Sequence, residues 1–431
     1  MNTTASEAAA KPAGFKRFTH SLLFWVILAI IFGAILGQVL PSWAITPFAT
    51  FNDVFGQFIN FMVPIIILGL VAPAIYELGV SGGKWLLVTV GIAYASTLIG
   101  GFGTWGIASV LYPSLLAKQQ VPDLASPENA VASALGGNLT IDPVMTVTAA
   151  LVLAFVFGIA VSSVNAAKIG ELMIDLRNVV MKVIVKVIVP LLPLHILGIF
   201  MNMSKSGQFA TVIVAMAKVI VFAFALTMIM LLLQYSLAGI IDRRNPLKAL
   251  WGMRDAYFTA LGTASSAATI PVTVRCTRAN GVSHEIGDFV IPLCATIHLA
   301  GSMIKITAFA LALQYMMGIA VHPASMVSFI LMLGVTMVAA PGVPGGAIAA
   351  AQGVLQGILG FSDPMYGIMV AMYVAVDSFG TATNVTGDGA IAIIVDRLAG
   401  GSLGTESDEY AEVAEDVATG RKETSRTPRL K

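Results

Sequence analysis

The sequence predicts an all-α protein that crosses a membrane many times. Of its 431 residues, 57% are hydrophobic and 11% are charged, and the mean hydropathy is +0.87. Such a composition leaves too little charge for a surface that faces water. The first half also contains several apolar runs that reach the roughly 20 residues a helix needs to cross a bilayer. The net charge of +1 and the lack of a basic patch give no indication of nucleic-acid binding.

Uninterrupted apolar runs fill the chain before residue 255. They span residues 22–40, 58–76, 85–111, 144–164, 178–203 and 210–240. Lys and Arg gather at the N-terminus and around the loop 241–255, whereas the segment 41–57 carries neither. The positive-inside rule therefore predicts a multi-pass membrane protein with residues 1–20 in the cytoplasm, and the expected location is the plasma membrane of a prokaryote. The charged, aromatic-poor segment 401–431 is predicted to be a disordered cytoplasmic tail.

Two later apolar segments are interrupted by Ser, Thr, Gly and Pro. The segment 256–280 contains GTASSA followed by Pro271, and the segment 325–360 contains APGVPGG at its middle. A helix that faces lipid could not satisfy its backbone at such points. Both segments are therefore predicted to be re-entrant helical hairpins, whose half-helix N-termini can hold an anion. The alternative is two ordinary helices with kinks at Gly and Pro.

A polar stripe runs along the last apolar segment, 364–398. Asp377, Thr381, Asn384 and Asp388 recur at helical spacing and so fall on one face. Ionisable groups inside a membrane segment are costly and usually functional. The stripe therefore indicates a solute or ion pathway, and the alternative is a pair of buried aspartates with structural partners.

Four motifs carry a family resemblance. They are RRNPLKALWGMRDAYFTALGTASSAATIPVTVR (243–275), FVIPLCATIHLAGS (289–302), GVPGG (342–346) and DSFGTATNVTGD (377–388). In this order they resemble the dicarboxylate/amino acid:cation symporter family, which includes the glutamate transporters. The resemblance implies an elevator-type, glutamate-transporter-like fold with eight transmembrane helices plus two re-entrant helical hairpins, assembled as a homotrimer.

The same resemblance implies that different parts of the chain have different roles. Within residues 21–255, helices 1, 2, 4 and 5 would mainly form a trimerisation scaffold, and helices 3 and 6 would move with the transport domain. Residues 256–400 would form the transport core. Its parts would be hairpin 1 (256–280), helix 7 (288–316), hairpin 2 (325–360) and helix 8 (364–398).

Substrate-binding residues are also implied by the resemblance. Backbone N–H groups of the two hairpin tips would hold a carboxylate of the solute. Asp377 matches the aspartate that receives the ammonium group of the substrate. The full set that the resemblance implies is Ser265, Ser266, Gly342, Val343, Pro344, Gly345, Lys305, Asp377, Gly380, Thr381 and Asn384.

A sodium site is implied beside the substrate site. Asn384 and Asp388 match a pair that helps to form it, with backbone carbonyls near Cys294, Thr296 and His298 as further oxygen ligands. The resemblance, at approximate register, also gives a cation site polar residues from the third helix, at Tyr94, Ser96 and Thr97. The alternative is ordinary helix packing, in which a run of this kind is common. The expected coupling ion is Na⁺ or H⁺, and no cofactor or catalytic residue is expected.

Three positions depart from the family pattern. HLAGS at 298–302 replaces the usual NMDGT, which predicts that a further sodium site is absent or altered. His298 is then either a titratable group that binds a proton in place of sodium, or a neutral imidazole that bonds its neighbours. Gly380 replaces the arginine that acidic-substrate members use. This favours a small neutral substrate, and the motif around Asp377 looks closer to the bacterial serine/threonine branch.

Lys305 is the third departure and leaves three alternatives. It replaces the missing arginine as an anion-binding group, it pairs with Asp377 or Asp388 as a built-in cation, or it extends toward an interface without a specific role.

The expected function is cation-coupled import of a small neutral amino acid, similar to serine or threonine, across the lipid bilayer. The alternative is a symporter of acidic amino acids or C4-dicarboxylates in which Lys305 replaces the arginine. Two further classes are an ion channel and an intramembrane hydrolase, and the sequence has neither GxSxG nor HExxH to support a hydrolase.

Overall fold

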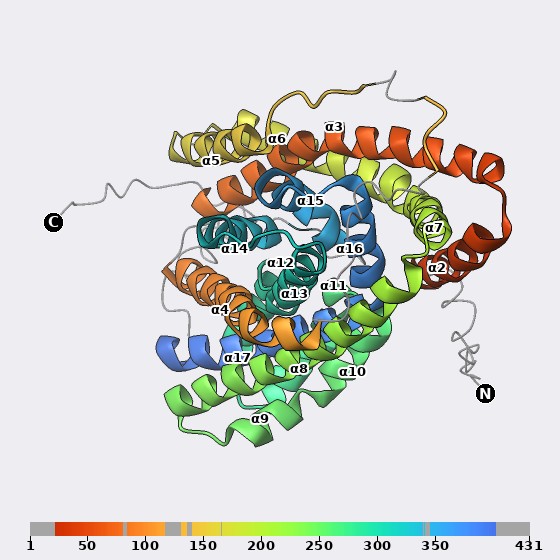
Figure 1. Ribbon diagram of the computed structural model, residues 1–431. Helices are drawn as coiled ribbons and strands as arrows, with labels where there is room; N and C mark the ends of the chain where they lie inside the picture. Colours follow the sequence, from red (N-terminus) through yellow and green to blue (C-terminus); the bar gives the residue numbers. More distant parts are fainter. Residues whose placement is uncertain are drawn as a thin grey trace, which may run out of the picture.

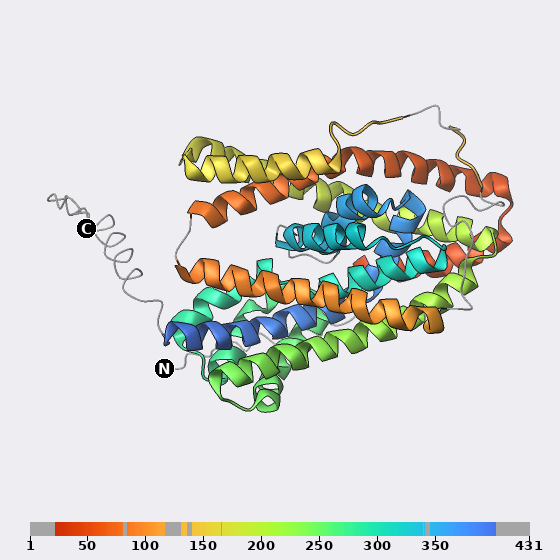
Figure 2. The same cartoon turned by 60° about the vertical axis from the view of Figure 1, so that its left-hand side comes forward.

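The computed structural model describes residues 22–80, 84–116, 131–135, 140–164, 166–338, 340 and 345–401, and every regular element among them is a helix (Figures 1 and 2). This confirms the predicted all-α class. Six of these helices are long and apolar enough to cross a membrane, or seven if a bent pair near the C-terminal end counts as one span. The eight spans implied by the resemblance are therefore not all evident by length and composition. The run expected at 144–164 is the shorter helix α5 (Val147–Ser163).

The long N-terminal helices lie along one another in pairs. Helix α2 (Leu22–Val39) packs along α7 (Val189–Lys205), and α3 (Ser42–Val80) packs along α5, as Figure 1 shows. The apolar run expected at 178–203 belongs to a longer path, in which a π-helical turn, Ile184–Ile188, joins α6 (Ala167–Val183) to α7. Large side chains of these helices join one hydrophobic cluster, to which the helix Phe209–Asp242 and residues 300–376 also contribute.

Two other early helices pack on the C-terminal part of the chain. Helix α4 (Lys84–Leu115) lies against α13 (Ala300–Met316), and α8 (Phe209–Asp242) lies against α17 (Asp377–Ala399). Figure 2 shows α4, α8 and α17 on the side of the molecule opposite α3 and α5. The packing therefore associates the expected helices 3 and 6 with the expected transport core.

Both interrupted segments fold as pairs of short helices. In the first, α10 (Arg254–Thr263) turns at Ala264, whose φ of 48° is left-handed, and continues as α11 (Ser266–Ala279). In the second, α14 (Pro323–Val338) precedes α15 (Gly346–Leu359). The two helices of each pair pack against each other, which the halves of a merely kinked helix do not do. A short helix that the sequence did not indicate, α9 (Pro246–Gly252), precedes the first pair.

Two helices predicted to be continuous are broken, and this corrects the sequence-based prediction. The expected helix 7 consists of α12 (His284–Ile297) and α13, interrupted at His298 and Leu299. The expected helix 8 consists of α16 (Asp363–Ala375) and α17, which meet at Val376 with a bend of 62°. Each break frees backbone groups that α-helix bonding would otherwise use. Buried polar side chains bind several of them, as described below.

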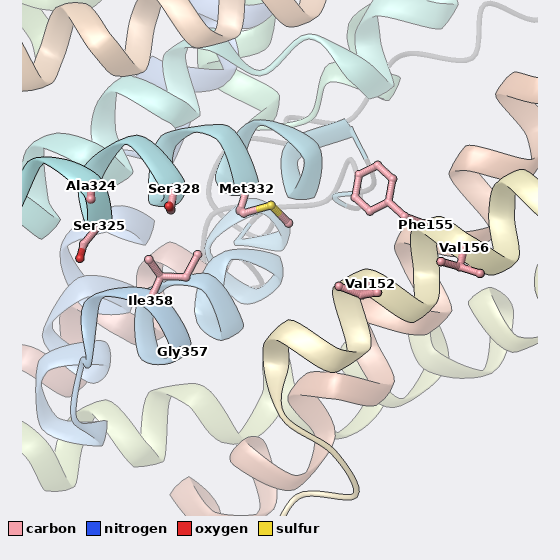
Figure 3. Close-up of a pocket in the computed structure, with 9 residues that line it drawn as sticks. All are labelled: Val152, Phe155, Val156, Ala324, Ser325, Ser328, Met332, Gly357 and Ile358. Atoms are coloured by element: carbon pink, nitrogen blue, oxygen red, sulfur yellow. The ribbon is translucent and has the colours of Figure 1, made fainter.

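A crevice of about 710 Å³ separates α5 from the second hairpin. Figure 3 shows Val152, Phe155 and Val156 of α5 on one side and Met332 and Ile358 of the hairpin on the other. Its lining is mainly apolar. Helix α5 is therefore only loosely packed on the hairpin along this boundary.

The close approach of α13 to α17 requires a glycine at position 301. A Cβ atom there would lie 2.6 Å from the carbonyl oxygen of Gly380 and 2.9 Å from Cβ of Thr383. We expect Gly301→Ala to destabilise the protein by about 1–3 kcal/mol because the added atom overpacks this contact. Gly103→Ala is the matched control, since a Cβ at that helical position meets no atom within 4 Å. Thermal unfolding of both variants in detergent measures the difference, and equal midpoints would contradict the expected crowding.

Candidate functional site

An ion pair lies at the bend between α16 and α17. The Lys305 Nζ atom of α13 is 3.2 Å from Asp377 Oδ1 and donates to the main-chain carbonyls of Val376 and Asp377, each at 3.3 Å. Only 2% of Lys305 and 7% of Asp377 is exposed. The break at Val376 places the carbonyl oxygens of Val376 and Asp377 beside the ammonium group.

The second oxygen of Asp377 also has a partner. The backbone N–H of Gly345, at the start of α15, donates to Asp377 Oδ2 at 2.8 Å. Gly345 has a left-handed φ of 75°, a conformation that glycine adopts without strain. The resemblance assigns this N–H to the substrate carboxylate, whereas in this structure it is bound to Asp377.

Gly380 provides the space that the Lys305 side chain fills. A Cβ atom at position 380 would collide with the Cε and Nζ atoms of Lys305. The same ammonium group lies 4.0 Å from the centre of the Tyr373 ring, an arrangement that stabilises a buried cation. Of the three alternatives for Lys305, the observed contacts match pairing with Asp377. The burial of Lys305 does not fit extension of its side chain toward an interface.

A second polar cluster surrounds His298 at the break between α12 and α13. The His298 Nδ1 atom lies 2.9 Å from Asp388 Oδ1, and its Nε2 atom lies 3.0 Å from Ser96 Oγ. Gln234 Nε2 of α8 donates to Ser96 Oγ at 2.8 Å and lies 3.2 Å from His298 Nε2. The cluster thus joins four helices through side chains that are all buried.

Asn384 connects α17 to the first turn of α13. Its Oδ1 atom accepts a hydrogen bond from the Gly301 N–H at 2.7 Å, and its Nδ2 atom donates to Ser302 Oγ at 3.4 Å. The Tyr373 hydroxyl also donates to Ser302 Oγ, at 2.8 Å. Asn384 therefore satisfies a free N–H created by the helix break, in addition to any role in binding.

The remaining expected site residues are placed less centrally. Ser265 caps α11 by accepting from the Ala268 N–H at 3.3 Å, and Ser266 is the first residue of that helix. The Thr381 hydroxyl donates to the Asp377 carbonyl at 3.1 Å. Gly342, Val343 and Pro344 lie outside the described residues.

The expected sodium ligands are only partly brought together. Asp388 and His298 are in contact, and the Cys294 carbonyl accepts from the His298 N–H at 2.9 Å. Thr296 is exposed, and its hydroxyl donates to its own helix at the Leu293 carbonyl. Ser96 joins the cluster, whereas the hydroxyls of Tyr94 and Thr97 donate to main-chain carbonyls elsewhere.

Gln234 and Tyr373 were not predicted from the sequence. A signal for Gln234 exists, because it is a lone amide within the apolar run LLLQYSL of α8. Polar side chains in membrane helices face the protein interior and bond across helices. Tyr373 gives no comparable signal, since tyrosine is common in apolar helices.

Two buried oxygens in the His298 cluster have no hydrogen-bond partner among the described residues. They are Asp388 Oδ2 and Gln234 Oε1. Carboxylate and amide oxygens are ligands that a hard cation prefers, so this donor set fits a transported Na⁺. The described residues contain no group of three or more His, Cys, Asp and Glu side chains that could hold a resident metal ion.

Comparisons with known proteins identify the family of this chain. The serine/threonine transporter SstT of Acinetobacter baumannii (strain AYE) is 27% identical over 391 residues, which cover 87% of this chain and 96% of that protein. Human excitatory amino acid transporter 2 is 29% identical over 273 residues, which cover 61% of this chain but only 46% of the human protein. A family profile described as "Sodium:dicarboxylate symporter family" matches residues 22–398. The chain therefore belongs to the sodium:dicarboxylate symporter family and is a cation-coupled membrane transporter, not an enzyme.

Proposed function

We propose that this transporter imports a small carboxylate-bearing solute together with a cation, and that the solute binds between the two hairpins and α17. The observation that carries this proposal is the position of Asp377. Its buried carboxylate lies at a helix break and contacts the N–H of Gly345 at the edge of the second hairpin. Helix ends and interrupted helices of this kind are how transporters build solute sites within the membrane.

Two solute classes fit the site. A small neutral amino acid is supported by Gly380, which contributes no side-chain charge, and by the similarity to a serine/threonine transporter. A solute with additional carboxylate character, such as a C4-dicarboxylate or an acidic amino acid, is supported by the buried ammonium of Lys305 next to Asp377.

The proposed mechanism is an elevator movement in a homotrimer. In this mechanism residues 256–400, with α4 and α8, move across the plasma membrane relative to α2, α3, α5 and α7. The loosely packed crevice between α5 and the second hairpin supports a sliding boundary, since close interdigitation there would oppose movement. Both termini are proposed to be cytoplasmic on the charge distribution.

Sodium is the proposed coupling ion, bound by Asp388 with Asn384 and carbonyl oxygens near Cys294, Thr296 and His298. The unpartnered Asp388 Oδ2 atom supports this assignment. Proton coupling is the second candidate, and it is favoured by the imidazole of His298 that contacts Asp388.

Uptake into proteoliposomes tests the proposed function. Uptake of labelled serine, aspartate and succinate is measured under three separate conditions. These are an inward sodium gradient, choline in place of sodium at the same pH, and an inward proton gradient. We expect at least one solute to accumulate only when a cation gradient is present. Solute movement that neither saturates nor depends on any cation gradient would contradict a symporter and favour a channel.

A further inference from the structure

The ammonium of Lys305 and the carboxylate of Asp377 form a buried ion pair. We propose that Lys305 takes the place of a solute ammonium group on Asp377, so that the transported solute is a small carboxylate without an ammonium group. This inference rests on the proposed function, because it assumes that this site binds the transported solute. The solute class is identified from the contacts of Lys305.

The first argument is that both partners are already satisfied. An ammonium group has three donors, and Lys305 Nζ has three oxygens at 3.2–3.3 Å, namely Asp377 Oδ1 and the carbonyls of Val376 and Asp377. The other carboxylate oxygen of Asp377 accepts from the Gly345 N–H at 2.8 Å. A solute ammonium could therefore reach Asp377 only by displacing one of these partners.

The second argument is that a displaced Lys305 has no other counter-charge. The buried acidic side chains among the described residues are Asp377 and Asp388, and Asp388 already contacts His298. A cavity of about 220 Å³ adjoins Lys305, but its lining is apolar, with Ile220, Phe224 and Phe379 as its large side chains. Moving the ammonium group there would leave a buried charge without a partner, which is strongly unfavourable.

The third argument concerns charge in the site. The Lys305–Asp377 pair is neutral as a whole, so a solute carboxylate meets no net negative charge when it approaches the hairpin N–H groups. A solute ammonium would instead approach the buried ammonium of Lys305, and like charges repel strongly where water is excluded. Carboxylates that carry a hydroxyl or hydrogen at the α-carbon avoid this repulsion.

Matched solutes test the inference directly. Glycerate and serine differ at the α-carbon by a hydroxyl in place of the ammonium group, and malate and aspartate differ in the same way. Cation-driven uptake of the four labelled solutes is measured in proteoliposomes. Within each transported pair we expect the hydroxy acid to be preferred by about tenfold or more, since displacing a buried ion pair costs at least that factor.

Two variants connect the preference to Lys305. Lys305→Met keeps the length of the side chain but frees Asp377, so the preference is expected to shift toward serine or aspartate. Lys205→Met is the matched control. Lys205 is the last residue of α7 and donates to the Leu40 carbonyl, so this variant should keep the wild-type preference. Size-exclusion chromatography checks that each variant is folded. If Lys305→Met is not folded, the double variant Lys305→Met/Asp377→Asn takes its place. With both charges removed, the hydroxy-acid preference should still disappear.

The outcomes separate the two proposals. Wild-type uptake that favours the amino acid in a transported pair would overturn the inference while leaving cation-coupled symport intact. A hydroxy-acid preference that survives Lys305→Met, or the double variant in its place, would also overturn it. Wild-type failure to take up these four solutes and succinate under every cation gradient would instead overturn the proposed function and the inference with it.

Discussion

Asp377→Asn is expected to abolish uptake and to lower the free energy of unfolding by about 3–5 kcal/mol. The substitution leaves the Lys305 ammonium buried without a counter-charge, with only neutral oxygens and the Tyr373 ring as partners. It also replaces an oxygen that accepts from the Gly345 N–H. Uptake into proteoliposomes and thermal unfolding of the purified protein measure the two effects separately.

A double variant distinguishes loss of the ion pair from loss of a binding group. Asp377→Asn/Lys305→Met removes both charges, so we expect most of the stability to return, together with uptake that no longer prefers hydroxy acids. Asp288→Asn is the control, because Asp288 pairs with Arg278 at the surface, where an ion pair contributes only about 0–1 kcal/mol. If Asp377→Asn and Asp288→Asn lowered the midpoint equally, the buried pair would have no special structural importance.

His298→Leu is expected to produce a similarly large loss of stability, about 3–5 kcal/mol, together with a stronger dependence of stability on sodium. Without the imidazole, neither oxygen of the buried Asp388 carboxylate has a hydrogen-bond partner among the described residues. Sodium ions that bind there would neutralise the carboxylate and stabilise the folded protein. Thermal unfolding in sodium chloride should therefore have a higher midpoint than in choline chloride at equal ionic strength.

Two variants control this measurement. His298→Leu/Asp388→Asn removes the carboxylate and should remove the sodium effect. His195→Leu deletes another buried histidine, which bonds Asn52 Oδ1 at 3.1 Å, and should cost only about 0.5–1.5 kcal/mol with no sodium effect. Identical midpoints of His298→Leu in sodium and choline would exclude Asp388 from a sodium site.

Much of the helical architecture was predictable from hydropathy and from the positions of Gly and Pro. Apolar runs without breakers indicated the long helices, and the segments that contain GTASSA and APGVPGG proved to be helix pairs. The breaks at His298 and Val376 were missed because neither IHLA nor VAVD contains Gly or Pro. Polar partners from distant helices, and not local backbone preference, stabilise these breaks.

The site was predictable in its residues but not in its pairings. Asp377, Thr381, Asn384 and Asp388 are all buried on α17, but so is every residue from Gly380 to Val395, so burial does not single out their face. Sequence alone could not decide which aspartate contacts Lys305, since that depends on the bend at Val376 and on the space beside Gly380. The same holds for Gln234, whose position next to His298 follows from the packing of α8 on α17.

The proposed movement of residues 256–400 relative to α3 during transport can be tested with one cross-link. A Cβ atom at Gly56 of α3 would lie 3.5 Å from Cβ of Asp363 at the start of α16. This separation is within the range of about 3.5–4.5 Å that a disulfide spans. Gly56→Cys/Asp363→Cys is prepared with Ala in place of Cys276 and Cys294, and each single-cysteine variant serves as a control.

Uptake is measured before oxidation, after oxidation and after reduction. We expect oxidation to stop uptake only in the double-cysteine protein, and reduction to restore it, because the disulfide fixes α16 to α3. Undiminished uptake by protein that is fully cross-linked would contradict the movement of the transport unit.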